Sequence, residues 1–91
     1  MPMYSIDYDL SKPGQNYTDL IETIQSFPDW AHVLKSSWVV KSPKTAMQVL
    51  ETLLPHIDAN DKIIVKQCTG VSAWIGLSDE LSNWLKGTNA A

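Results

Sequence analysis

Arginine is absent from this chain of 91 residues, and all seven of its basic residues are lysines. The chain carries a net charge of −3 at pH 7. Strong nucleic-acid binders usually carry a basic excess, and arginine is their usual bidentate contact to phosphate and guanine. The composition therefore counts against a strongly electrostatic nucleic-acid binder and leaves room for a local lysine patch.

Cysteine, histidine and long apolar runs are also scarce. Cys68 is the single cysteine, which excludes an internal disulfide and favours a reducing, cytoplasmic location. His32 and His56 have no ligand partner at zinc-finger spacing. No run approaches the roughly 20 apolar residues of a membrane span, and we expect no secretory signal at the N-terminus.

Hydrophobic periodicity predicts a single domain over residues 1–91, with a core at 3–67 and a C-terminal appendage at 68–87. Asn16 is expected to cap the first helix, Ser42-Pro43 to start the second, and Gly87 to end the last in the left-handed conformation. The expected elements are a strand at 3–9, a helix at 17–27, a hairpin of strands at 30–35 and 38–41, a helix at 43–54, a strand at 62–67, an edge strand at 71–75 and a helix at 79–86.

The predicted order is strand, helix, strand, strand, helix, strand, followed by an appendage. This order is typical of the α+β, ferredoxin-like βαββαβ fold, a four-stranded antiparallel sheet with both helices on one face. The other face would be uncovered. Four tryptophans in so short a chain indicate that a second subunit covers this face or the appendage, so we expect a homodimer. Whether residues 68–87 exchange between subunits stays open.

Two carboxylates, Asp7 and Asp9, share one face of the first predicted strand because side chains alternate along a strand. They would lie roughly 7 Å apart. One hypothesis is that the pair holds a magnesium ion, with Asp9 as the catalytic ligand that activates water at a phosphate. The alternative is that Asp9 accepts hydrogen bonds from the turn at 11–14 while Asp7 is solvated.

A second candidate surface combines lysine and tryptophan. Lys35, Trp38, Lys41 and Lys66 fall on strands that pair in the predicted fold, where they could bind single-stranded nucleic acid by charge and stacking. The alternative is that the lysines protect solvated strand edges from aggregation.

Several short motifs resemble a known family. They are the stretches 8–15 (Tyr-Asp-Leu-Ser-Lys-Pro-Gly-Gln), 37–41 (Ser-Trp-Val-Val-Lys) and 73–76 (Ala-Trp-Ile-Gly), with Asp61 entering the last strand. Together they resemble the small CRISPR-associated spacer-acquisition subunit and, more closely, the bacterial SinR-like proteins of that superfamily. The likeness covers roughly residues 3 to 77.

The resemblance implies a dimer in which the aspartate that ends the first strand lies near the dimer axis, where it is a candidate magnesium ligand. By that match Asp9 is the residue carried over. The superfamily also includes VapD-type toxins, which resemble endoribonucleases. Three functions therefore stay open: a non-enzymatic dimeric module that contacts protein and possibly nucleic acid, a magnesium-dependent nuclease that uses Asp9, and a toxin–antitoxin-type regulator that binds another protein.

Overall fold

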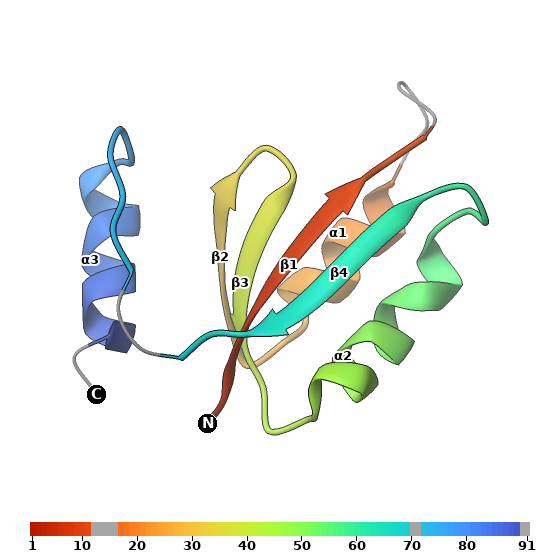
Figure 1. Cartoon of the computed structure of the whole chain (residues 1–91), viewed down its shortest axis with the longest axis horizontal. Helices are drawn as coiled ribbons and strands as arrows, with labels where there is room; N and C mark the ends of the chain where they lie inside the picture. The colour runs from red at the N-terminus through yellow and green to blue at the C-terminus, as the bar shows by residue number, and fades with distance from the viewer. Residues whose placement is uncertain (12–16, 70–71, 90–91) are drawn as a thin grey trace.

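The computed structural model describes residues 1–11, 17–69 and 72–89. It is an α+β structure in which one open, four-stranded antiparallel sheet carries three α-helices (Figure 1), an arrangement compatible with a ferredoxin-like fold. The elements are β1 (Met3–Asp9), α1 (Thr18–Gln25), β2 (Asp29–Leu34), β3 (Ser37–Lys41), α2 (Ala46–Leu53), a short 3-10 turn η1 (Leu54–His56), β4 (Lys62–Gln67) and α3 (Asp79–Asn89).

β1 is a central strand of the sheet, whose order is β2-β3-β1-β4. It pairs antiparallel with β3 on one side and with β4 on the other. The expected hairpin forms between β2 and β3, with a register irregularity between His32 and Leu34. β2 and β4 are therefore the edge strands, and the central strands β1 and β3 each pair with a neighbour on both sides.

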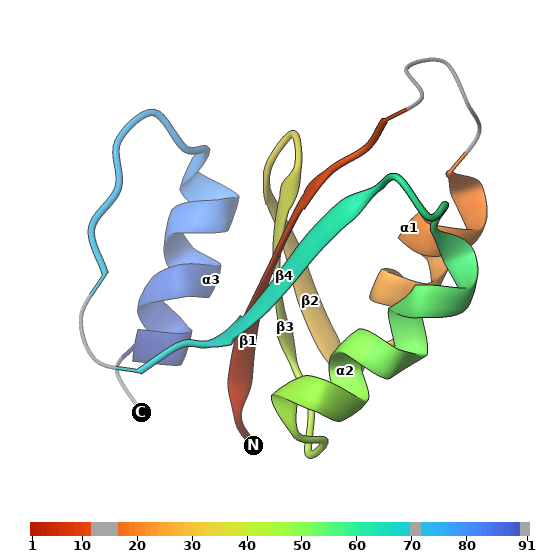
Figure 2. The same ribbon diagram turned by 45° about the vertical axis from the view of Figure 1, so that its right-hand side comes forward.

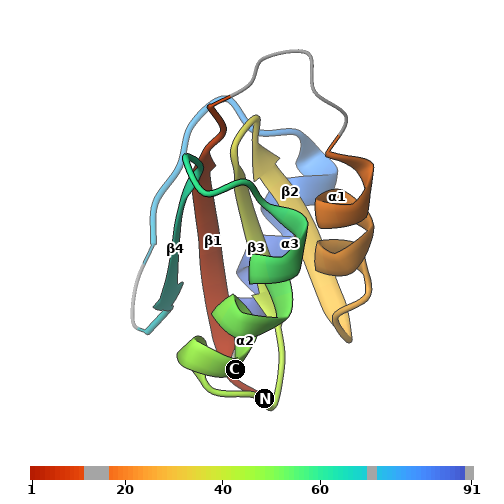
Figure 3. The same ribbon diagram turned by 90° about the vertical axis from the view of Figure 1, so that its right-hand side faces the viewer.

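The main core lies between the sheet and helices α1 and α2, which cover the same face (Figures 2 and 3). The alternation along β1 sends Tyr4 and Ile6 into this core, and β3 contributes Trp38 and Val40. The helices contribute the apolar stripe expected from their spacing, namely Leu20, Ile24, Val49 and Leu53.

Helix α3 lies on the opposite face of the sheet (Figure 2), where it contacts β2 and buries Leu85. The expectation that this face is left without cover inside one chain is therefore wrong for the part of the sheet under α3. Two of the four tryptophans, Trp74 and Trp84, belong to this C-terminal arm, which we define as residues 72–87. They find partners within the chain, so the number of tryptophans alone does not require a second subunit.

Helix α2 begins later than the sequence predicted. Its N-cap is Thr45, whose hydroxyl accepts from the backbone of Gln48 while the Gln48 side chain accepts from the backbone of Thr45. This reciprocal capping box satisfies two exposed backbone donors at once and outweighs the cap expected at Ser42. Ser42 is buried instead, and its backbone N–H donates to the carbonyl of Pro2.

The C-terminal arm also differs from expectation. Residues 72–75 form no strand, because the chain leaves the sheet after β4 and returns across the face opposite α1 and α2, which we call the second face. Val71, the first residue of the expected edge strand, lies outside the described residues, and so does the expected cap Asn16. Ser78 caps α3 as predicted, by accepting from the backbone N–H of Leu81. Gly87 lies within the helix. Among the glycines that the structure describes, the one with a positive φ, 82°, is Gly76 at the turn before the helix.

The described residues contain no helix that combines the length and the apolar character needed to cross a bilayer.

A paired substitution tests the position of the core. Leu53 is fully buried, whereas the adjacent Leu54 is 46% exposed. We expect Leu53→Ala to lower the free energy of unfolding by about 2–5 kcal/mol, because it leaves a cavity, and Leu54→Ala to lower it by less than about 1 kcal/mol. Urea denaturation measures both values, and equal losses in the two variants would contradict this placement of α2.

Candidate functional site

Asp7 and Asp9 lie on the second face of the sheet, as the alternation predicted. Across β1 and β4, Asp7 is opposite Ile64 and Asp9 is opposite Lys62. Asp9 is exposed, whereas Asp7 is half-buried and accepts a hydrogen bond from the Ser37 hydroxyl on β3. Asp7 is thus tied to the neighbouring strand rather than solely solvated.

The surroundings of this pair are mixed in character. A shallow hollow of about 250 Å³ is lined by Asp7 and Asp9 from β1 and by Lys62 and Ile64 from β4, with Tyr8 and Ile63 completing it. Within the described part of the chain, no group of three or more acidic, histidine or cysteine side chains comes together. Magnesium often uses only one or two protein carboxylates and takes water and phosphate for the rest, so the magnesium hypothesis stays a prediction for experiment.

The predicted lysine–tryptophan surface does not form as a unit. Trp38 is only 2% exposed, stacks on His32 at a centroid distance of 3.9 Å, and donates its indole N–H to the Tyr8 hydroxyl at 3.0 Å. No base can stack on it, which corrects its assignment as a binding residue. The reason is that Trp38 shares the core face of β3 with Val40, so the helices cover it.

The three lysines of that surface lie in different places. Lys35 is exposed in the turn of the β2–β3 hairpin, and Lys66 is exposed near the end of β4. Lys41 is half-buried under the C-terminal arm, where its ammonium lies 5.6 Å from the ring centroid of Trp84. Lys35 and Lys66 keep exposed charge, whereas Lys41 is engaged within the chain.

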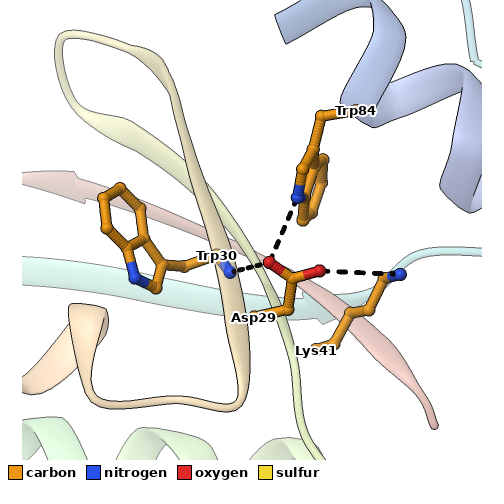
Figure 4. Close-up of polar contacts among 4 residues, drawn as sticks. All are labelled: Asp29, Trp30, Lys41 and Trp84. Carbon is orange, nitrogen blue, oxygen red and sulfur yellow. Dashed lines mark hydrogen bonds and ion pairs between the residues drawn. The ribbon is translucent and has the colours of Figure 1, made fainter. Parts of the chain in front are cut away.

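The cluster around Asp29 anchors α3 to the sheet (Figure 4). One carboxylate oxygen of Asp29 accepts from the indole N–H of Trp84 at 3.2 Å and from the backbone N–H of Trp30 at 2.9 Å. The other oxygen lies 3.8 Å from the ammonium of Lys41. One side chain on β2 therefore joins β3, its own strand and α3.

A cavity of about 460 Å³ lies between the second face of the sheet and the C-terminal arm. Its floor comes from the strands and its roof from the arm. The lining comprises Met3, Ser5, Val33, Val39, Lys66, Gln67, Cys68, Thr69, Ser72, Ala73, Trp74, Leu77 and Leu85. This volume falls in the range of small-molecule sites.

At the far end of the sheet, Asp61 accepts hydrogen bonds from three residues in two connecting segments. One oxygen accepts from the backbone N–H and the hydroxyl of Ser11 at 2.7 and 2.9 Å and from the Tyr17 hydroxyl at 3.1 Å. The other accepts from the backbone N–H of Asp58 at 2.8 Å. The backbone donor of Ser11 is the largest cause, and with the other donors it outweighs desolvation and lowers the pKa of Asp61 to about 2.

These contacts differ from the hydrogen bonds expected between Asp9 and the turn after β1. Ser11 donates to Asp61 rather than to Asp9, and residues 12–14 of the expected turn lie outside the described residues. The site therefore separates into a structural aspartate, Asp61, and two aspartates on the sheet face, Asp7 and Asp9.

Comparison of the chain with protein-family models, with curated proteins and with solved structures finds no match. The candidate sites consequently rest on the geometry of the structure, and the resemblance in sequence stays a prediction.

Sequence reasoning missed the anchor at Asp29, the cavity and the hydrogen bonds of Asp61. Asp61 carried a partial signal, because it ends a run of turn-forming residues at 58–61 and precedes a strand. The sequence carried no signal for the contact between Asp29 and Trp84, since these residues are 55 positions apart and meet only when α3 packs against the sheet.

The Asp61 cluster makes an acid-stability prediction. Its folded pKa of about 2 lies below its ordinary 3.8, so the stabilisation is present above about pH 4 and is lost as the pH falls toward about 2. We expect Asp61→Asn to be less stable than the unmodified protein above pH 4 and to show a smaller change between pH 4 and pH 2. Urea denaturation across this range tests it.

Tyr17→Phe is a graded control, because it removes one donor and raises the folded pKa of Asp61 only part of the way. If Asp61→Asn loses stability in acid as steeply as the unmodified protein, the hydrogen bonds do not act as described.

Proposed function

We propose that this chain is a non-enzymatic, homodimeric binding module with a ferredoxin-like fold, of the kind its sequence resembles among spacer-acquisition subunits and SinR-like proteins. The observation that carries the dimer is the composition of the sheet face beyond α3. There the exposed Ile64 lies among Asp7, Asp9 and Lys62, and we call these four residues the β1–β4 face.

The charges of the β1–β4 face suit self-association. In a two-fold contact the same patch meets itself, so each charge needs its opposite within the patch. The acidic side chains Asp7 and Asp9 lie on β1, whereas Lys62 lies beside them on β4. A second copy turned by 180° can place Asp9 against its partner's Lys62 and bury Ile64, which is 52% exposed in one chain.

The open edge of β4 is a less suitable contact. Pairing two β4 strands about Ile64 would put Lys62 directly opposite Lys66 of the second copy, and like charges in that position destabilise a pair. Edge lysines of this kind oppose strand addition. The face of the sheet therefore supports a dimer better than its edge does.

The non-enzymatic reading is supported by the same residues. The Asp7 carboxylate is already bonded to Ser37, and the hollow is lined by apolar side chains and one lysine in addition to the two acids. The second carboxylate in the hollow, Asp7, is held by the Ser37 hydroxyl. Nucleic-acid contact through the exposed lysines Lys35 and Lys66 stays part of the proposal for the module.

The dimer is tested by a charge placed at its centre. We expect Ile64→Asp to shift the molar mass in light scattering from dimer to monomer, because it buries an unpaired carboxylate among Asp7 and Asp9. Met47→Asp is the matched control: Met47 is 62% exposed in the first turn of α2, where a carboxylate is favourable. A monomeric unmodified protein, or a dimer that survives Ile64→Asp, contradicts the proposal.

The magnesium-dependent nuclease is the second candidate, favoured by the two carboxylates on one uncovered face. For a non-enzymatic module we expect no cleavage of labelled RNA or DNA with or without magnesium. Cleavage that requires magnesium, disappears in Asp9→Asn and persists in Asp19→Asn on α1 would instead establish the nuclease. A salt-sensitive shift of uncleaved RNA or DNA would establish binding alone.

A further inference from the structure

The cavity beneath the C-terminal arm has a floor that changes from polar to apolar across the sheet. The floor's central row runs from Lys66 on β4 through Ser5 on β1 to Val39 on β3, each directly opposite the next. Residues directly opposite in antiparallel strands have Cβ atoms about 4.5–5.5 Å apart. A charged group, a hydroxyl and an aliphatic side chain are therefore placed in sequence along one line.

The polar end of this row is free to bind. Lys66 is the one charged side chain in the cavity lining and has no ion pair among the described residues. The hydroxyl of Ser5 likewise makes no side-chain hydrogen bond there, although Ser5 is half-buried. An ammonium and a neighbouring hydroxyl form a two-point donor site for an anionic oxygen group.

The side of the cavity over β2 and β3 is apolar. Val39 and Val33 continue the floor, while Trp74, Leu77 and Leu85 of the C-terminal arm lie above it. The indole of Trp74 is held in place, since its N–H donates to the Ser82 hydroxyl at 3.0 Å. A fixed aromatic roof above two valines suits a flat or linear hydrocarbon group.

We propose that this cavity is a binding site for a small amphipathic monocarboxylate. The carboxylate lies at Lys66 and Ser5, and the hydrocarbon body lies between Val39 and the roof of the arm. Because Lys66 is exposed, the charged end of the ligand lies toward solvent while the hydrocarbon is covered. The cavity shares no lining residue with the neighbouring β1–β4 face, and the proposal does not rest on the proposed dimer.

The donor set favours a carboxylate over a phosphate. A phosphate group carries more charge and more oxygen acceptors, and its sites usually combine several cations, an arginine fork or a row of backbone N–H groups. This cavity offers one ammonium and neutral hydroxyls. A single carboxylate charge on the ligand balances the single positive charge of Lys66.

The experiment is calorimetric titration of the full chain with naphthoate, an aromatic acid, and with decanoate, an aliphatic acid. We expect saturable binding of at least one of them with a stoichiometry of one per chain. Lys66→Met keeps the length of the side chain and removes its charge, and we expect it to weaken binding by at least about tenfold. Lys86→Met removes an exposed charge from the arm, outside the lining, and we expect it to bind as the unmodified protein does.

Naphthylmethanol, the uncharged counterpart of naphthoate, separates the charge from the hydrocarbon. We expect it to bind the unmodified protein more weakly than the acid and to bind Lys66→Met with unchanged affinity. The absence of saturable binding by both acids would overturn the proposal, as would equal affinities for Lys66→Met and the unmodified protein. Light scattering reports the dimer and calorimetry reports the cavity in the same unmodified chain, so failure of the dimer and failure of this site are distinguishable.

Discussion

The Asp29 carboxylate fixes the C-terminal arm to the sheet. The α1–α2 side of the sheet is a continuous apolar core, whereas on the opposite side the described residues provide cover only where the C-terminal arm docks. That docking depends on the bond from the Trp84 indole to Asp29, on the nearby Lys41 ammonium and on the burial of Leu85. The ion pair itself is partly exposed and contributes little; the directional bond and the apolar contact set the position of the arm.

The arm divides the second face of the sheet into two regions with different chemistry. Beneath it lies a partly open cavity with one lysine at its polar end. Beyond it, Asp7 and Asp9 lie beside Lys62 and the exposed Ile64. A longer arm would cover both regions, and an undocked arm would expose both. The function proposed for each region thus follows from where one helix is anchored.

Much of this architecture follows from local patterns in the sequence. The alternation in β1 predicted both the core residues Tyr4 and Ile6 and the shared face of Asp7 and Asp9. Pattern alone could not say which face of β3 is the core face, and Trp38 was misplaced for that reason. The start of α2 was missed because Thr45 and Gln48 compete with Ser42 as a cap. The docking of α3 could not be predicted, since it depends on a contact between residues far apart in the chain.

The most direct test is the rate at which the Trp84 indole proton exchanges with solvent, measured by NMR in the unmodified chain and in Asp29→Ala. If the arm is docked at Asp29, the Trp84 indole proton exchanges slowly in the unmodified chain and fast in Asp29→Ala. The indole of Trp38, which is bonded to Tyr8 in the core, would stay protected in both and serves as the folding control. If the Trp84 proton exchanges in the unmodified protein as fast as that of an exposed tryptophan, the arm is not anchored at Asp29, and the division of the sheet face is wrong.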